Sequence, residues 1–199
     1  MTDTNTNQVD LNWQGPFALM GSDVALCFEC SAAREPGLYL WTFEFRGGYL
    51  IYGVGLTTRP LAKRLTEHIR GFSSGQYTIL KWRTAQNGIR EEAWHGMWKG
   101  YDSPERQAER LARHVEIEIA ANEMMSKMRV FLAPLPPNKR VLNRLEAAIM
   151  KILYAGSGPV VELPDKGVHL EPRKPSEPPL LVHNNTPYML HGLPATFQA

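Results

Sequence analysis

The sequence lacks any long hydrophobic run. Across its 199 residues, no apolar stretch approaches the roughly 20 residues that a membrane-spanning helix needs. The N-terminal segment MTDTNTNQVD has neither a basic start nor an apolar stretch, so we expect no secretory signal. These two absences favour a water-soluble, cytoplasmic protein without a membrane partner, in which residues 1–12 form a flexible leader.

Cysteine is also scarce, because only Cys27 and Cys30 occur, in the segment LCFECS. A structural zinc site usually takes four Cys or His ligands, and no second Cys pair or closely spaced His pair is present to complete one. We therefore interpret both residues as buried thiols. Metal or redox chemistry at this pair is the less favoured alternative.

The chain has no strong net charge, with a formal value of +2 at pH 7, but its charge is unevenly distributed. Between Arg59 and Arg90, seven basic residues stand against one acid, Glu67, which gives this segment a charge of +6. A local field of that sign favours polyanions such as nucleic acid. A solvated basic face without a partner is the alternative.

The hydrophobic patterns predict an α+β domain. We expect a β-hairpin over LYLWTFEF-RGG-YLIYGVG, an amphipathic helix from Pro60 with Thr58 as its N-cap, and a third strand at YTILKWRT. These strands would form a small antiparallel three-stranded sheet flanked by helices. A long helix opening at Ser103 with the apolar line Leu111, Val115 and Ile119, a strand at KMRVFLAPL, and a helix capped by Asn138 would follow.

Composition also sets the expected domain boundaries. Residues 13–156 would form one domain with a helical insertion at about 88–130, since 199 residues suit a single domain with elaborations. Residues 157–199 are rich in proline and glycine, for example in EPRKPSEPPLL. We expect an irregular C-terminal extension there, packed on the domain.

Within the predicted helix, Arg64 and His68 are four positions apart and therefore share one face beside the apolar stripe of Leu61, Leu65 and Ile69. The segment GLY at 37–39 precedes them in one strand, and GVG at 53–55 lies in the next. In this order and spacing, the residues resemble the GIY-YIG nuclease superfamily, closely over residues 37–80 and more loosely as far as Glu146.

The resemblance implies a metal-dependent endonuclease acting on DNA. Tyr39 would orient or activate the attacking water, Arg64 would stabilise charge on the phosphate, and His68 would relay a proton. Glu146, at the edge of the buried stripe of the last helix, would hold Mg²⁺, which Mn²⁺ would replace. Less well placed candidates for this carboxylate are Glu91, Glu92, Glu116 and Glu118. Arg59, Lys63 and Asn185 are the candidate contacts to substrate.

The sequence departs from the family pattern at the second tyrosine, because Gly53 stands where the pattern has Tyr and Tyr52 comes one residue earlier. Side chains alternate along a strand, so a regular strand would point Tyr52 away from the site. A β-bulge at Gly53 would re-aim it, and glycine inside a strand often marks a bulge. With that bulge, Tyr52 is a fifth catalytic candidate.

Two alternatives remain open from the sequence. Instead of a nuclease, the chain would be a catalytically impaired nucleic-acid-binding module on the same scaffold, with its second tyrosine lost. It would otherwise be an unrelated α+β protein in which the hairpin and helix are ordinary core.

Overall fold

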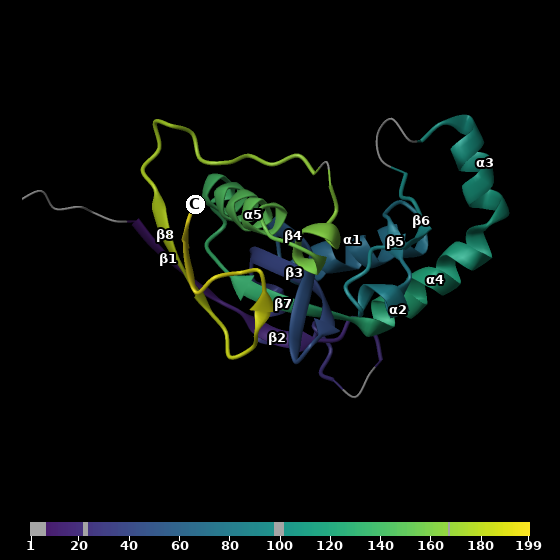
Figure 1. Cartoon of the computed structure of the whole chain (residues 1–199), viewed down its shortest axis with the longest axis horizontal. Helices are drawn as coiled ribbons and strands as arrows, with labels where there is room; N and C mark the ends of the chain where they lie inside the picture. Colours follow the sequence, from purple (N-terminus) through teal and green to yellow (C-terminus); the bar gives the residue numbers. More distant parts are fainter. Residues whose placement is uncertain (1–6, 22–23, 98–101, 167) are drawn as a thin grey trace, which may run out of the picture.

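The computed structural model describes residues 7–21, 24–97, 102–166 and 168–199, and it has the mixed α+β composition that the sequence predicts (Figure 1). In chain order, its elements are β1 (Asn7–Asn12), β2 (Gln14–Phe17), a 3-10 turn (Ser31–Arg34), β3 (Gly37–Phe45), β4 (Gly48–Thr57), α1 (Leu61–Ser73), β5 (Ile79–Leu80), α2 (Trp82–Ala85), β6 (Glu92–Trp94), α3 (Pro104–Ala112), α4 (His114–Lys127), β7 (Met128–Pro134), α5 (Lys139–Tyr154), α6 (Pro159–Glu162), β8 (Leu180–Asn185), β9 (Leu190–His191) and β10 (Thr196–Gln198).

A five-stranded sheet in the order β2-β7-β3-β4-β9 forms the centre of the fold. The predicted hairpin is confirmed as β3 and β4, which pair along their whole lengths. Arg46 and Gly47 join them, and both have positive φ, at 44° and 75°. Positive φ at both central residues suits a tight hairpin turn whose twist matches that of the strands.

The predicted third strand at 77–84 is wrong in extent and in partner. Only Ile79 and Leu80 are extended there, they pair with β6 in a separate two-stranded sheet, and the chain turns into α2 at Trp82. The strand beside the hairpin is β7, antiparallel to β3. Its residues 130–133 are all completely buried, which is the pattern of a central strand covered on both faces.

The two faces of the sheet carry separate hydrophobic clusters. On one face, Tyr39 and Trp41 of β3 pack in a cluster that includes Leu65 of α1 and Met124 of α4. On the opposite face, Leu38 packs in a cluster with residues of α5, β1 and β8. Since successive strand residues point to opposite faces, β3 is buried on both sides and fixes α1 and α5 on either side of the hairpin.

The prediction that Thr58 caps α1 is wrong, because the N-cap is Pro60 and Leu61 is the first helical residue. A backbone bond from Leu61 N to Glu35 O, at 2.9 Å, supports the start instead of a capping side chain. Gly75, with φ of 72°, lies two residues after the last residue of α1. In α5, the Asn138 side chain accepts a hydrogen bond from Val141 N, which confirms the predicted cap.

The long helix predicted from Ser103 is divided at Arg113 into α3 and α4, and its predicted apolar line is wrong. Leu111, Val115 and Ile119 are 63, 54 and 56% exposed. The face of α4 that packs on the core instead carries Ile117, Ala121, Met124 and Met125. Met side chains adapt to irregular gaps, and here they fill the space against β5 and α1.

Both ends of the described chain are more regular than expected. Residues 7–12 are not a flexible leader but form β1, parallel to β8, while residues 1–6 lie outside the described part. The C-terminal extension is not irregular throughout, because it contains α6 and three strands. It packs on the domain as predicted, with β9 adding to the edge of β4. Among the described residues, no helix has both the length and the apolar character needed to cross a bilayer.

Candidate active site

A cleft of about 920 Å³ opens along the edge of β4. The short strand β9 pairs only with Tyr49 and Leu50, so within the described part of the chain no strand covers this edge of β4 from Tyr52 onward. Helix α1 borders this edge on one face of the sheet and α5 on the other. The cleft is lined by Tyr39, Tyr52, Arg64, His68, Tyr77, Arg90, Glu92, Lys139, Asn143, Glu146, Asp165, Lys166 and Glu171, among others.

Tyr39 reaches this edge from the neighbouring strand because it lies across a glycine. Its cross-strand partner is Gly55, and a Cβ at that position would come within 2.2 Å of the Tyr39 ring and hydroxyl. The side chain is 2% exposed. Its hydroxyl lies 2.7 Å from His68 Nε2. Burial raises the pKa of Tyr39, although the Arg64 guanidinium opposes this effect, so the phenol is neutral at rest.

The Tyr39 hydroxyl and His68 Nε2 share a hydrogen bond, in which we assign Nε2 as the acceptor. Burial, with a contribution from Arg64, lowers the pKa of His68 from 6.5 to about 3, so its ring is neutral near pH 7. A neutral imidazole has one acceptor nitrogen, and the phenol is the available donor to Nε2. The Tyr39–His68 pair is therefore a hydrogen-bonded proton donor and acceptor at the edge of the sheet.

Arg64 lies one turn before His68 and contacts an acid that sequence reasoning did not assign. Its Nη1 donates to Glu67 Oε2 at 3.2 Å, and Arg59 binds both oxygens of the same carboxylate at 2.9 Å. Glu67 thus lies between two guanidinium groups on the outer side of α1. This contact holds the Arg64 head group near the cleft without removing its positive charge.

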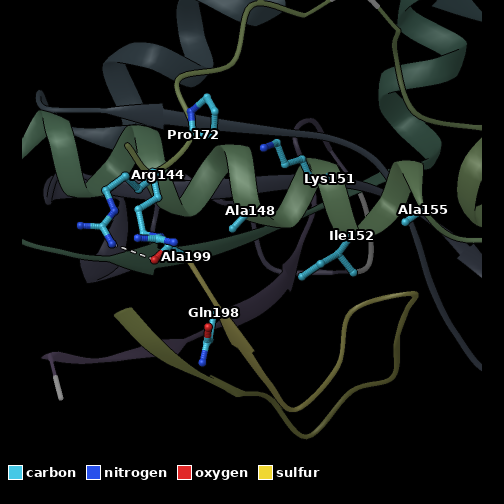
Figure 2. A pocket seen from close by; sticks show the side chains of 9 residues that line it. Arg144, Ala148, Lys151, Ile152, Ala155, Pro172, Gln198 and Ala199 are labelled. Carbon is cyan, nitrogen blue, oxygen red and sulfur yellow. Dashed lines mark hydrogen bonds between the residues drawn. The ribbon is translucent and has the colours of Figure 1, made fainter. Parts of the chain in front are cut away.

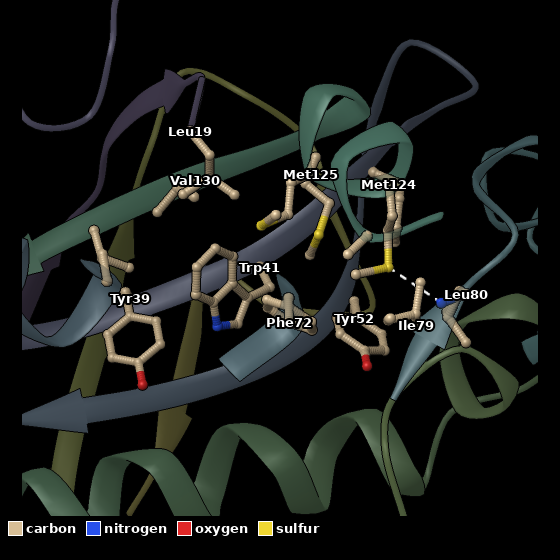
Figure 3. Packing of buried hydrophobic residues seen from close by; sticks show 14 of the residues in the cluster. Leu19, Tyr39, Trp41, Tyr52, Phe72, Ile79, Leu80, Met124, Met125 and Val130 are labelled. Atoms are coloured by element: carbon tan, nitrogen blue, oxygen red, sulfur yellow. Dashed lines mark hydrogen bonds between the residues drawn. The ribbon is translucent and has the colours of Figure 1, made fainter. Parts of the chain in front are cut away.

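The predicted bulge is present in β4. Trp41 pairs with Gly53 and Thr42 with Ile51, which leaves Tyr52 as the extra residue. Tyr52 consequently joins the same hydrophobic cluster as Tyr39 and Trp41, and Figure 3 shows the two tyrosine hydroxyls pointing to the same side of that cluster. The sequence-based condition for Tyr52 to face the site is therefore met.

The Tyr52 hydroxyl nevertheless has its own partners. It is 3.1 Å from Thr78 O and 3.2 Å from Asp165 Oδ2, either of which can accept its proton. Asp165 in turn accepts from Arg90 Nη2 at 2.7 Å. Burial, together with Asp165, raises the pKa of Tyr52 well above its usual value. Tyr52 therefore belongs to a second polar group in the cleft, separate from the Tyr39–His68 pair.

Glu146 faces the cleft from α5, on the opposite wall. Burial raises its pKa from 4.5 to about 7, with Arg64 lowering it and Glu171 raising it further. Its carboxylate has no hydrogen-bond or ion-pair partner among the described residues. One turn earlier, Asn143 donates from Nδ2 to Glu171 Oε2 at 2.6 Å. A half-buried carboxylate without a partner is costly unless a cation binds it.

These residues fit a magnesium ion that keeps much of its water. Mg²⁺ prefers oxygen ligands and is commonly held by one or two carboxylates together with substrate phosphate and water. The free Glu146 carboxylate meets that requirement, and the Asn143 amide oxygen and Glu171 lie on the same wall. Within the described ranges, no group of three or more His, Cys, Asp or Glu side chains could form a closed metal site.

The cysteines are placed as buried or half-buried thiols, in line with the preferred interpretation. Cys27 is buried and Cys30 donates from its thiol to the Cys27 carbonyl at 3.1 Å. Burial raises the pKa of Cys27 to about 12, so its thiol is protonated near neutral pH. Reactive cysteines instead have lowered pKa values.

The structure does not bring every predicted site residue to the cleft. Arg59 and Lys63 are exposed on the outer side of α1 and do not line the cavity. Asn185 lies at the end of β8, where its side chain contacts Asp10 and Asn12 of β1, so its expected role in the site is wrong. The asparagine that lines the cleft with Glu146 is Asn143, on the same helix.

Of the alternative carboxylates, only Glu92 lines the cleft, where it binds Arg90 and His95. Glu91 pairs with Lys81, and Glu116 and Glu118 are exposed on α4. Spacing from Glu146 would have identified Asn143, three positions earlier on the same helix face. Nothing in the proline-rich extension indicated Asp165 or Glu171, because in a segment without regular periodicity the sequence does not show which side chains face the domain.

The basic segment at 59–90 is about half neutralised in the fold. Four of its seven basic residues contact carboxylates, in the pairs Arg59–Glu67, Arg64–Glu67, Lys81–Glu91, Arg90–Glu92 and Arg90–Asp165. Two of these acids come directly after the segment and one comes from the C-terminal extension, and these three lower its charge from +6 to +3. The remaining positive charge is on Lys63, Arg70 and Arg83, which do not line the cleft.

A second cavity, of about 460 Å³, lies along a different face of α5, toward the C-terminal strands (Figure 2). Arg144 lines it and donates from Nη2 to Pro178 O and Ala199 O, both at 2.7 Å. None of the predicted catalytic residues lines this cavity. Its arginine acts as a clamp between α5 and the end of β10, which indicates a packing role.

Comparison with known proteins adds no family to this geometry. A scan against protein-family models, a search of curated proteins and a search of solved structures each found no match.

Proposed function

We propose that this protein is a metal-dependent endonuclease that hydrolyses phosphodiester bonds in DNA through a GIY-YIG-type site. The observation that carries the proposal is the convergence of Tyr39, Arg64, His68 and Glu146 on one cleft. These are the four side chains that the motif assigned to the reaction, and they come from three different elements. A core without a catalytic role has no reason to gather a tyrosine–histidine pair, an arginine and an unpartnered carboxylate.

The sheet also supports the finer fold proposal. Strands β4, β3 and β7 are consecutive and antiparallel, with α1 and α5 on opposite faces. We infer that these elements are the GIY-YIG-like unit. The strands β2 and β9, together with β1, β8 and β10, are additions around it.

Proton movement in the proposed reaction follows from the Tyr39–His68 hydrogen bond. As a water molecule attacks the phosphorus, the Tyr39 oxygen takes a proton from that water and its own proton passes to His68 Nε2. Near neutral pH Nε2 is unprotonated and can accept this proton, and the negative charge that grows on the phosphate would stabilise the resulting imidazolium. Tyr39 stays protonated because its pKa is raised, and a neutral phenol is a weak base, so Tyr39 can take a proton from water only as it passes its own to His68.

The remaining residues handle charge. Arg64 would bind the non-bridging phosphate oxygens, where negative charge grows in the transition state. Glu146 would hold Mg²⁺ from the α5 wall, with Asn143 and Glu171 beside it. When bound, the metal supplies Lewis-acid stabilisation of the phosphate and the leaving oxygen.

Plasmid nicking tests the proposal. Purified protein with Mg²⁺ or Mn²⁺ should convert supercoiled DNA to open circles, and chelation of the metal should stop the reaction. Glu146→Gln should lower the rate at least about 100-fold, since the metal site is lost. Glu118→Gln, which changes an exposed glutamate on α4, is the matched control and should nick like the parent. A parent that cleaves neither plasmid nor single-stranded DNA, or a Glu146→Gln variant that cleaves equally well, would refute the assigned chemistry.

One observation favours a second candidate, a nucleic-acid-binding module without cleavage. The hydroxyl of Tyr52 is held by Thr78 and Asp165, and Gly53 occupies the family's tyrosine position. Binding of DNA by the parent, without turnover in either metal, would favour this candidate. In that case the DNA affinities of the parent and of Glu146→Gln should fall equally with salt concentration, because binding does not need the reaction.

A further inference from the structure

The size of the cleft limits which form of DNA can enter it. A cavity of about 920 Å³ lies within the roughly 300–1,000 Å³ range of pockets that enclose small molecules. Such a space holds a few nucleotides of one strand.

The reactive groups lie between two walls. Tyr39, Arg64 and His68 belong to the wall formed by the hairpin and α1, whereas Glu146 belongs to the α5 wall. Hydrogen bonds tie the extension to both walls: Tyr52 to Asp165 at 3.2 Å, and Asn143 to Glu171 at 2.6 Å. A phosphate must therefore enter between the walls, since the Tyr39 side chain is only 2% exposed.

The positive charges that line the cleft are also enough to bind only a few phosphates. Four of the basic residues at 59–90, Arg64 among them, are already paired with carboxylates, and Lys63 and Arg70 do not line the cleft. Besides Arg64, which shares its charge with Glu67, Lys139 and Lys166 line the cleft, and neither has an acidic partner among the described residues. Proteins that grip duplex DNA commonly neutralise about 6–10 phosphates. The cleft offers about three cations.

Tyr77 supplies the other requirement of a single-strand site, an aromatic ring at the cleft. It lines the cleft next to His68, with 5.0 Å between the two ring centroids, whereas Trp41 and Phe72 behind it are buried in the core. Tyr77 is half-buried and presents its ring beside the reactive pair. Unpaired bases stack on aromatic rings without regard to sequence, whereas paired bases already stack on one another.

From these four features, we propose that the cleft accepts an unpaired DNA strand, such as a single-stranded segment or a flap, in preference to base-paired duplex. This inference names the substrate class of the same site and rests on the proposed endonuclease function. The reacting phosphate would lie between Arg64 and Glu146, and a neighbouring base would stack near Tyr77.

Binding and cleavage are measured separately so that the two proposals can fail separately. The binding arm uses the full-length Glu146→Gln variant, checked by circular dichroism, with a labelled 12-nucleotide strand or its blunt duplex and fluorescence anisotropy. We expect the single strand to bind at least about tenfold more tightly. With about three phosphate contacts, the slope of log K against log salt should be about −2. Equal or tighter duplex binding, or a slope steeper than about −5, would overturn the inference.

Two matched variants locate the strand. Lys139→Ala removes a cation from the cleft and should reduce the salt slope by about 0.7, whereas Arg70→Ala on the outer side of α1 should leave it unchanged. A change with Arg70→Ala alone would place the strand outside the cleft and overturn the inference.

The cleavage arm uses the parent protein with Mg²⁺ on single-stranded, flap and duplex DNA. Cleavage of duplex at the same rate as the other two would overturn the inference while leaving the endonuclease proposal intact. Tight single-strand binding without cleavage of any of the three would support the binding preference and refute the endonuclease function.

Discussion

Replacing Glu146 by Gln should stabilise the metal-free protein, and the gain should grow with pH. Burial raises the pKa of Glu146 from 4.5 to about 7. A carboxyl group with a folded-state pKa above its unfolded value contributes stability at low pH, and that contribution is lost as the pH rises from 4.5 through 7. At about 1.4 kcal/mol per pKa unit, ionised Glu146 costs the fold up to about 3 kcal/mol at pH 8 and about 1 kcal/mol at pH 5.

Urea unfolding of the parent and Glu146→Gln at both pH values measures this difference directly. His68 has a lowered pKa and acts in the opposite direction, but it is present in both proteins and cancels in the comparison. Adding Mg²⁺ should stabilise only the parent, because the metal binds the folded carboxylate. A difference between the two proteins that does not change with pH, or equal stabilisation of both by Mg²⁺, would refute the placement of a buried, cation-binding carboxylate.

Three further predictions follow from the site. Gly55→Ala places a Cβ 2.2 Å from the Tyr39 ring and should lower the free energy of unfolding in urea by about 1–3 kcal/mol and remove most of the cleavage rate. Gly53→Ala, whose Cβ lies 3.6 Å from Trp41, should behave like the parent, and equal effects of the two substitutions would contradict the close packing of Tyr39 on Gly55. Tyr39→Phe removes the hydroxyl bonded to His68 and should cost about 1 kcal/mol in stability and at least about 100-fold in single-turnover cleavage, and unchanged cleavage would exclude the proton-transfer role. At low Mg²⁺ concentration, the cleavage rate should rise with pH through about 7 as Glu146 ionises, and the midpoint of this rise should move to lower pH as the Mg²⁺ concentration increases. A midpoint that does not depend on Mg²⁺ would assign the titration to another group.

The parts of the fold that the sequence predicts well are those with strong local signals. The hairpin shows alternating aromatic and aliphatic residues around a glycine turn, and α5 combines an Asn138 cap with a regular apolar stripe. Leu142, Leu145 and Ile149 of that stripe are completely buried. The Arg64–His68 spacing likewise fixed both side chains on one helix edge before any tertiary information was available.

The errors arise where tertiary packing overrides a local pattern. Leu111, Val115 and Ile119 repeat at helical spacing, yet the core side of α4 is chosen by the fit of Met124 and Met125 against β5 and α1. Strand pairing across the sheet is also not local, so the place of β7 beside β3 could not be deduced from residues 77–84.

In the site, the sequence identified the residues with motif spacing but not their partners. The bulge at Tyr52 was inferred from Gly53, because glycine has a recognisable positional meaning in a strand. Glu67, Asp165 and Glu171 were missed as partners because ion pairs and hydrogen bonds between distant segments leave no periodic trace in the sequence.

The central claim is that Arg64, together with Tyr39, His68 and Glu146, forms one phosphodiester-cleaving centre. The most direct measurement is Mg²⁺-dependent, single-turnover DNA cleavage by Arg64→Ala and Arg70→Ala, two variants that each remove one arginine from α1. We predict that Arg64→Ala loses at least about 100-fold in rate, as expected for a group that stabilises transition-state charge, and that Arg70→Ala cleaves like the parent. Equal rates for the two variants, or no cleavage by the parent, would contradict the account.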